Sequence, residues 1–454
     1  MNIIFTKAWR DIQINPKRTA LVLFALILGI WGVGTVFVSY YILNLDLNRN
    51  FLQTDPPHAI LYLDSIESPD IEAITALPEV ESAEFRDYAR ERIEIRPDVW
   101  VPLMLYGVDD FKEMKVARIF AEDDHFSPKK GTIFIERDGL KVSYIEPGKN
   151  VRIRVDGRVT EVPVKGIVFD PAQAPATQES MIYGYTDPQT FYQITGKPSG
   201  SRLLLRLSQV GSQKEAKSAI ETIISQLENR GVKVYGKDIP LFLEHPHQWQ
   251  LNTILFLVGA IGLLAFLMSA VLVSQLMGAI MVSHTRQIGV LKATGATRFQ
   301  VLKMYVLMLM IIGTVAGIIA VPLALIAGNG FAHFIAGILN FNIYTSPPFW
   351  IGVLLMLISI SLPIIMSLFK ILQGTGIPVR QALSDYGISQ RIQLTSRWFN
   401  QLTIPHYLVL ALRNSLRNRK RVFITVLTMA LGVAIFSTGF NVRRSLWNFL
   451  STMD

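Results

Sequence analysis

The sequence predicts a membrane α-helical bundle with an extracytoplasmic α+β domain between its first and second spans. Half of the 454 residues are hydrophobic and only 17% are charged, which is too apolar for an ordinary soluble protein. The uncharged residues gather in runs long enough to cross a bilayer, which takes about 20 residues. The basic residues gather at alternate ends of these runs, as they do in proteins that cross a membrane several times.

Stretches without an Asp, Glu, Lys or Arg side chain predict five spans. Residues 19–45 form the first span, and the region between Glu244 and Arg286 contains the second. Met304–Phe369 is a run of 66 uncharged residues, long enough for the third and fourth spans and the connection between them. Residues 422–442 form the fifth span, so the predicted bundle has four spans plus one.

The distribution of basic residues predicts the orientation. Segments 1–18, 284–303 and 370–421 hold 17 of the 44 Lys and Arg residues and only two acidic residues. The positive-inside rule makes these segments cytoplasmic, together with the N-terminus, and places residues 46–245 outside the cell. The net charge of +9 therefore reports topology, and we expect no nucleic-acid partner. The first apolar run is too long for a signal-peptide core and is predicted to be an uncleaved anchor.

The domain at 46–245 is predicted to mix helices and strands. Hydrophobic patterning predicts strands at His58–Leu63, Leu203–Leu207 and Val232–Tyr235, and helices at Pro69–Leu77 and Gly211–Arg230. The second helix is expected to bury Ala216, Ile220, Ile223 and Leu227. Asp156-Gly157 separates two alternating runs and predicts a hairpin, because both turn positions need a positive φ. This hairpin belongs to a β-rich insert at about 130–195.

A short basic segment separates the second and third spans. It reads Arg286-Gln287-Ile288-Gly289-Val290-Leu291-Lys292-Ala293-Thr294-Gly295-Ala296-Thr297-Arg298. Gly295 lets the backbone leave a helix, and Thr297 can cap the helix that follows. The segment has no nucleophile, carboxylate or metal ligand, so no catalytic residue is expected in it. We expect it to be held by a partner protein.

This segment resembles the REIG-x-L-x-A-x-G-A signature of the FtsX/MacB-type permeases, with Gln287 in place of the usual Glu. In that family the short helix fits into a groove of a separate ATPase. The resemblance implies that the ATPase-coupling residues are Arg286, Ile288, Gly289, Leu291, Lys292, Ala293, Gly295 and Ala296. Ile288 and Leu291 are expected to form an apolar ridge, and Arg286 and Lys292 a basic rim. Gly376–Gly387, with its Pro-x-x-x-Ala-Leu core, is similar to the segment after the last span of the family's FtsX domain.

The resemblance and the spans together predict five parts. They are an amphipathic N-terminal helix with the first span (1–45), a MacB-like core domain (46–245), an FtsX-like domain with spans two to four (246–375), a cytoplasmic linker (376–403) and the start of a second repeat with the fifth span (404–454). Nine identities at a spacing of 403 residues, from Ala8 and Ala411 to Phe37 and Phe440, indicate this repeat. The chain is therefore expected to be the N-terminal half of a two-repeat permease or a five-span form.

The resemblance also implies a function. The chain would be the non-enzymatic permease subunit of a mechanotransmission-type ABC transporter of the MacB/LolC/FtsX kind, which exports or extracts a substrate. It would lie in the bacterial inner (plasma) membrane and work with a cytoplasmic MacB/LolD-type ATPase that holds the ATP. A second permease half or a homodimer, and an extracytoplasmic partner protein, are the other expected partners. No cofactor or metal is expected on this chain itself. Two alternatives are an FtsX-like regulator that activates an extracytoplasmic hydrolase, and a membrane-anchored binding or sensor protein.

Three other groups of residues are predicted to be structural. Gly231–Lys237 fits G-x-x-x-x-G-K, but Asp238 follows instead of Ser or Thr and the run alternates like a strand, so we expect no phosphate site. His245-Pro246-His247 is predicted to be a turn and not a metal site, because no Cys or carboxylate pair lies nearby. Glu122–His125 is predicted to be a solvated loop, with weak Ca²⁺ binding as the alternative.

Overall fold

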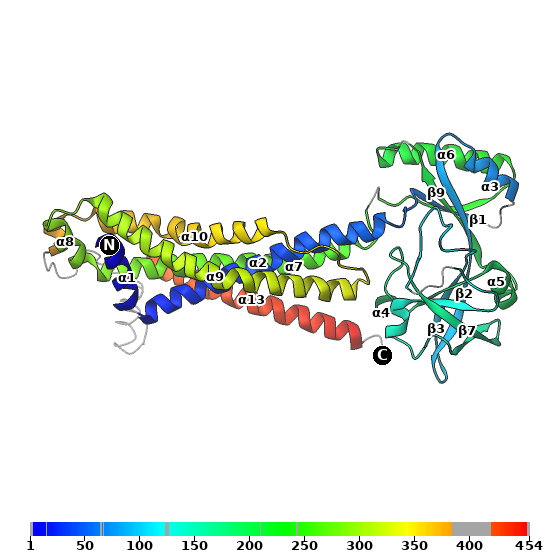
Figure 1. The fold of residues 1–454 in the computed structure, drawn as a ribbon, viewed down its shortest axis with the longest axis horizontal. Coiled ribbons are helices and arrows are strands. Elements are labelled where there is room, and N and C mark those ends of the chain that lie inside the picture. The colour runs from blue at the N-terminus through cyan, green and yellow to red at the C-terminus, as the bar shows by residue number, and fades with distance from the viewer. Residues whose placement is uncertain are drawn as a thin grey trace, which may run out of the picture. The chain divides into compact units, whose positions relative to one another are not determined.

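A computed structural model describes residues 3–14, 16–63, 66, 68–122, 127–208, 210–241, 244–383 and 419–451. The chain divides into two compact units, each with its own contacts (Figure 1). The first unit contains residues 1–40, 254–331 and 346–454. The second contains residues 41–253 and 332–345.

Four helices of the described residues are long and apolar enough to cross a membrane. They are α2 (Pro16–Leu52), α7 (Gln248–Ser283), α9 (Arg298–Ile338) and α10 (Phe349–Gly376). Helix α2 extends beyond residues 19–45 at both ends, and α7 lies within the uncharged region predicted to contain the second span. Helices α9 and α10 share the run 304–369, as predicted. Helix α13 (Arg419–Ser451) covers the fifth predicted span but is not one of these four, so its role as a span stays a prediction.

Small residues allow the helices of the first unit to pack closely. A Cβ added at Gly313 of α9 would lie 2.6 Å from the carbonyl oxygen of Ser359 in α10, and the Ser359 hydroxyl donates to the Gly313 carbonyl at 2.8 Å. A Cβ added at Gly29 of α2 would lie 2.6 Å from the Cβ of Ser269 in α7. Close backbone approach with side-chain hydrogen bonds is the usual way in which helices associate within lipid.

The second unit is a β-rich domain built on one sheet. Its strands are β1 (Ala59–Leu63), β2 (Val80–Arg96), β3 (Val99–Gly107), β4 (Phe120–Ala121), β5 (Ile133–Glu136), β6 (Asn150–Val155), β7 (Arg158–Phe169), β8 (Ile182–Thr186), β9 (Gly200–Leu207) and β10 (Val234–Asp238). Their order is β10-β1-β9-β2-β3-β8-β5-β7-β4, and β6 pairs with β2 and β7. The helices are α3 (Ser68–Thr75), α4 (Ala176–Glu179), α5 (Pro188–Thr195) and α6 (Gln213–Asn229), with a 3₁₀ turn, η1, at Arg137–Lys141.

Predictions for this domain that depend on residues close together in sequence are confirmed. The four residues expected on the buried face of α6 are all buried. The hairpin forms between β6 and β7, with Val155 opposite Arg158 and positive φ angles of 47° at Asp156 and 82° at Gly157. Lys237 of the phosphate-loop-like run lies in strand β10, as its alternating pattern indicated.

Candidate functional site

The short basic segment between the second and third spans forms helix α8 (Thr285–Ala293). The helix ends in a Schellman motif, in which Gly295 N donates to the Lys292 carbonyl at 3.1 Å and Ala296 N donates to the Leu291 carbonyl at 2.9 Å. Gly295 has a φ of 101°, which only glycine adopts without strain. Both the exit at Gly295 and the start of a new helix directly after it were predicted from sequence.

A capping box starts α9 directly after this turn. Gln300 N donates to Thr297 Oγ1 at 3.2 Å, and Thr297 N donates to Gln300 Oε1 at 2.9 Å. The predicted capping role of Thr297 is therefore confirmed. The two motifs fix the path of the chain on both sides of the turn, so α8 is a defined element and not a flexible link.

One side of α8 faces the interior of the protein. The Ile288 side chain is only 1% exposed and belongs to the hydrophobic core of the first unit. A Cβ added at Gly289 would lie 2.8 Å from the Cβ of Ala382 in α11 (Val379–Leu383). Ile288 was expected to form an apolar ridge for a partner together with Leu291. This expectation is corrected for Ile288, because the core of the protein already covers its side chain.

Two basic side chains of the segment bind the C-terminal end of α10. This is the end of the fourth span that is predicted to face the cytoplasm. Lys292 Nζ donates to the Ile377 carbonyl at 2.8 Å, and Arg298 Nη2 donates to the Leu372 carbonyl at 3.0 Å. These carbonyls lie at the C-terminal end of α10, where cations are favoured by the helix dipole. Lys292, predicted as part of a basic rim, therefore serves here to hold α8 against α10.

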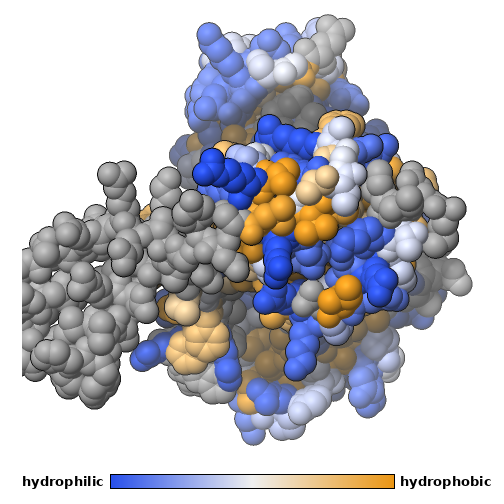
Figure 2. Space-filling model, turned by 90° about the vertical axis from the view of Figure 1, so that its left-hand side faces the viewer, coloured by the Kyte–Doolittle hydropathy of each residue, from blue (hydrophilic) through white to orange (hydrophobic). Residues whose placement is uncertain are grey.

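The opposite side of α8 is exposed. Arg286, Val290 and Ala293 occupy one face at spacings of four and three residues, and all three are exposed. We call these three residues the docking face. Of the other predicted coupling residues, Gly295 is exposed, while Leu291 and Ala296 are partly buried. Figure 2 views the molecule from the side on which α8 lies in Figure 1, and hydrophobic surface there is bordered by hydrophilic residues.

Gln287, which replaces the Glu of the family signature, contacts the N-terminal helix α1 (Ile3–Ile14). Lys7 Nζ donates to Gln287 Oε1 at 3.3 Å and also pairs with Asp11 Oδ1 at 2.6 Å. The Asp11 carboxylate is 6% exposed, so Lys7 compensates a buried charge. The amide oxygen of Gln287 accepts a hydrogen bond from Lys7. Because the amide is neutral, it does not compete with the Asp11 carboxylate for the positive charge of Lys7.

Ile288→Ala and Val290→Ala are expected to lower the stability of the protein by different amounts. Ile288 lies on the buried side of α8, whereas Val290 lies on its exposed side. Loss of a buried Ile side chain costs roughly 2–5 kcal/mol, whereas Val290 is 49% exposed and should cost less than about 1 kcal/mol. Thermal unfolding of the full chain in nanodiscs would measure both. Equal losses of thermal stability would contradict the burial of Ile288.

A second candidate site lies in the second unit, where the chain connects α9 to α10. Arg137 donates from Nε to Asn340 Oδ1 at 2.8 Å, from Nη1 to Asn342 Oδ1 at 2.8 Å and from Nη2 to the Asn340 carbonyl at 3.2 Å. Its guanidinium also lies 3.6 Å from the centre of the Phe169 ring. Asn340 has a φ of 56°, and its Nδ2 donates to the buried Glu136 at 2.8 Å.

The outer end of α2 holds the same connection from another side. The buried Asp46 carboxylate accepts hydrogen bonds from Tyr344 N, Thr345 N and Thr345 Oγ1 at 2.7–3.0 Å. Asn50 exchanges two hydrogen bonds with the Asn342 backbone. We call this set the outer latch: Asp46, Asn50, Glu136, Arg137 and residues 340–345. No sequence pattern indicates this set, because Asp46 appears in the sequence only as the end of an uncharged run.

The histidines and the acidic run considered from sequence take part in contacts within the protein. His245 Nε2 lies 2.9 Å from the Pro171 carbonyl, and His247 N donates to His245 Nδ1 at 2.9 Å, so both ring nitrogens have protein partners. No cluster of metal-ligating side chains occurs among the residues described. Glu122 pairs with Arg137 at 2.9 Å, and the rest of that acidic run, 123–125, lies outside the described residues.

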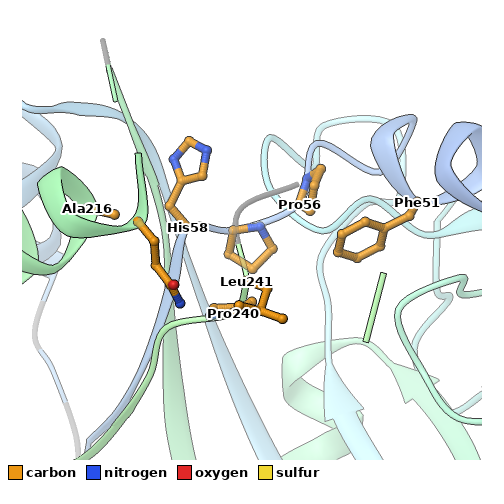
Figure 3. Close-up of a pocket in the computed structure, with 8 residues that line it drawn as sticks. Phe51, Pro56, His58, Ala216, Pro240 and Leu241 are labelled. Atoms are coloured by element: carbon orange, nitrogen blue, oxygen red, sulfur yellow. The ribbon is translucent and has the colours of Figure 1, made fainter. Parts of the chain in front are cut away.

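A small cavity lies between the outer end of α2 and helix α6. Its lining is shown in Figure 3 and consists of Phe51, Pro56, Pro57, His58, Gln213, Ala216, Pro240 and Leu241. The cavity volume is ≈ 10 Å³, which is about the space of one water molecule. It is therefore too small to hold a transported substrate.

Comparison with known families identifies the membrane region. Residues 259–377 match the family described as FtsX-like permease C-terminal, a stretch that begins within α7 and includes α8, α9 and α10. The resemblance to FtsX-type permeases is confirmed. Residues 259–377 are therefore similar to an FtsX-like permease domain, and the β-rich domain is inserted between the first and second candidate spans.

Two curated relatives are similar over a longer stretch. They are the pyoverdine export ATP-binding/permease proteins PvdT of Pseudomonas putida (strain KT2440), 24% identical over 360 residues, and of Pseudomonas entomophila (strain L48), 22% identical over 358 residues. Each alignment covers 71% of this chain and 51% of the relative. The chain thus spans about half the length of the curated relatives it matches.

Two solved structures are similar to part of this chain. One is the extracellular domain of the noncanonic ABC-type transporter YknZ from Gram-positive bacteria, with 14% identity and a TM-score of 0.27 over 39% of this chain and 98% of that one. The other is the periplasmic region of MacB from Actinobacillus actinomycetemcomitans, with 12% identity and a TM-score of 0.29 over 45% of this chain and 95% of that one.

Proposed function

We propose that this chain is the membrane subunit of an ABC transporter that exports or extracts a substrate by moving its extracytoplasmic domain. The match of α7 to α10 with the FtsX-like permease domain carries this proposal. The names of the two curated relatives refer to export, which supports the same direction here. The β-rich domain is the part that moves, and the proposal does not depend on which substrate is transported.

ATP hydrolysis in this proposal belongs to a separate cytoplasmic ATPase of the MacB/LolD type, which binds the docking face. Val290 supplies an exposed apolar contact at the centre of this face, with Arg286 one turn before it. Lys292 and Arg298 hold α8 to the end of α10, so a pull on α8 would act on this span as well. This chain contributes force transmission and no chemistry.

The helices provide a route for that force. Helices α2, α7 and α9 each run without interruption from the first unit into the second. Within the second unit, the outer latch binds the end of α2 and the α9–α10 connection to the β-rich domain. Near the start of α7, Gln250 Nε2 donates to Gln178 Oε1 at 3.2 Å. Movement of a helix would therefore reach the domain through hydrogen bonds, without a substrate crossing a central pore.

Val290→Asp tests the proposed ATPase contact. An unpaired carboxylate in a desolvated interface should weaken binding of the ATPase roughly tenfold to a hundredfold and abolish stimulated hydrolysis. Co-purification from membranes and coupled ATPase assays measure both. Val159→Asp is the matched control, because Val159 is an exposed valine of the β-rich domain. Full complex formation by both Val290→Asp and Arg286→Ala would show that α8 is not the coupling element.

Cysteine labelling tests the proposed orientation in the bacterial inner membrane. The chain has no native cysteine, so Tyr144→Cys in the β-rich domain and Thr297→Cys beside α8 each give one thiol. Both positions are exposed. In intact cells an impermeant thiol reagent should label Tyr144→Cys and leave Thr297→Cys unlabelled, because the basic segments are cytoplasmic. The reverse pattern would overturn the orientation and the ATPase contact together.

A further inference from the structure

The β-rich domain contains a cleft with a cavity volume of ≈ 410 Å³. Three parts of the domain line it: residues 83–87 of β2, residues 107–110 and 113–115 at the end of β3 and in the loop after it, and Pro188 and Phe191 of α5. Neighbouring side chains of a strand point to opposite faces of a sheet, so five consecutive residues cannot line a cleft from one face. They line it because the edge of β2 forms its wall.

This part of β2 is paired on one side only. Residues 80–88 pair with β9, whereas β3 begins to pair with β2 at Tyr88, opposite Tyr106. No other strand of the described residues pairs with Ala83–Asp87. An open strand edge presents backbone N–H and C=O groups in the spacing that an added strand requires. Five residues give an edge about 17 Å long at roughly 3.3 Å per residue.

The side chains of Glu84 and Arg86 bind residues 115–117 on one face of the sheet, and they leave the backbone edge of β2 open. Arg86 Nη2 donates to the carbonyls of Val116 and Ala117 at 2.6 and 2.8 Å, and Glu84 Oε2 accepts from Lys115 N and Val116 N at 3.0 and 3.1 Å. Arg86 and Glu84 also pair with each other at 2.8 Å. Their charges therefore compensate one another. The kind of ligand that the cleft attracts depends on its remaining charged side chains.

Those remaining charges are mostly negative. Asp87, Asp109, Asp110 and Glu113 line the cleft, against the single cation Lys115. Ser201 Oγ and Tyr192 OH hold the Asp87 carboxylate at 2.5 and 2.6 Å, whereas Asp109 and Glu113 are exposed at the rim. The buried side chains of Val108, Met114 and Phe191 give the cleft an apolar base. Such a lining suits cationic side chains that alternate with apolar ones.

We propose that this cleft binds an extended basic peptide segment of a partner protein, which adds as a strand to the open edge of β2. Backbone hydrogen bonds between the peptide and Ala83–Asp87 fix the register of the peptide. Its apolar side chains, at alternate positions, enter the cleft toward Phe191. Its lysines or arginines pair with Asp109 and Glu113. The site lies wholly in the β-rich domain and works independently of ATPase coupling. Its failure would leave the proposed transport function untouched.

Three labelled peptides test this binding to the full chain in zwitterionic nanodiscs, without ATPase. The first alternates Lys and Val over seven residues. The second has the same sequence with alternate backbone nitrogens methylated, which removes donors that strand addition needs. The third replaces Lys by Glu. Fluorescence anisotropy, corrected with empty nanodiscs, should show binding of the first peptide, at least tenfold weaker binding of the second and none of the third. Equal binding of the first two would overturn strand addition.

Paired variants locate the site. Asp109→Asn with Glu113→Gln should weaken the Lys-Val peptide roughly tenfold, since both rim charges are lost. Glu161→Gln with Glu228→Gln removes two exposed carboxylates elsewhere in the domain and is the matched control. All four positions are exposed, so folding should be preserved, which thermal unfolding verifies. Unchanged affinity in the cleft variant, or an equal loss in the control, would overturn the assignment to this cleft.

Discussion

Arg137→Ala is expected to uncouple the β-rich domain from the membrane helices while the ATPase complex stays intact. The substitution removes three hydrogen bonds to the α9–α10 connection and leaves the Oδ1 atom of the buried Asn340 without its donor. A buried acceptor left without a partner costs roughly 1–3 kcal/mol. Hydrogen exchange of residues 339–345 should therefore rise roughly tenfold to a hundredfold. The ATP-dependent change in exchange across 46–245 should disappear.

Two further variants make this prediction specific. Arg158→Ala removes an exposed arginine from the tip of the β6–β7 hairpin and should change neither measurement. Arg137→Lys keeps the charge but lacks the planar fork that reaches Asn340 and Asn342 together, so an intermediate effect is expected. Normal ATP-dependent exchange in Arg137→Ala would show that the outer latch does not transmit the motion.

Predictions from sequence succeeded where a signal lies within a few residues. The exit at Gly295, the capping box at Thr297 and the Asp156-Gly157 hairpin depend on backbone preferences that neighbouring residues set. The spans are equally local, because each is a run of uncharged residues longer than the bilayer requires. The predicted buried face of α6 follows from its helical periodicity alone.

Predictions failed where a distant segment decides which face is buried. Periodicity placed Ile288 on an apolar face of α8, and the structure agrees that this face is covered. The covering element is the protein itself, through the core and through α11, which begins 86 residues after α8 ends. A partner groove and an internal core both select apolar residues, so the pattern of α8 alone cannot distinguish them.

The outer latch shows the same limit for polar residues. Asp46 and Thr345 are 299 residues apart, and Glu136 and Asn340 are 204 apart. Asn48, Arg49 and Asn50 follow Asp46 closely in sequence, yet its carboxylate binds Tyr344 and Thr345. Asn340 looks like an ordinary loop residue. Their roles follow only from the tertiary fold, because long-range hydrogen bonds leave no periodic pattern.

Stability of the β-rich domain is expected to fall as the pH rises from about 5 to 8, and Glu136 is the group responsible. Its side chain is 1% exposed, and burial raises its pKa from 4.5 to about 7, although hydrogen bonds from Asn340 and the Asp138 backbone oppose the shift. A raised pKa means that the folded protein favours the protonated acid. This contribution is therefore fully present below about pH 4.5 and is lost as the pH rises through about 7, a change on the order of 3 kcal/mol.

Glu136→Gln tests this assignment, since glutamine stays neutral at every pH. Thermal unfolding of the full chain in nanodiscs should show a slope between pH 5 and 8 that is largely absent in Glu136→Gln. Glu161→Gln is the matched control, because Glu161 is exposed and its loss should leave the slope unchanged. A full slope in Glu136→Gln would assign the pH dependence to another buried acid such as Asp170, whose pKa is also raised by burial. Since Asn340 binds Glu136 directly, the same titration should also alter hydrogen exchange at residues 339–345.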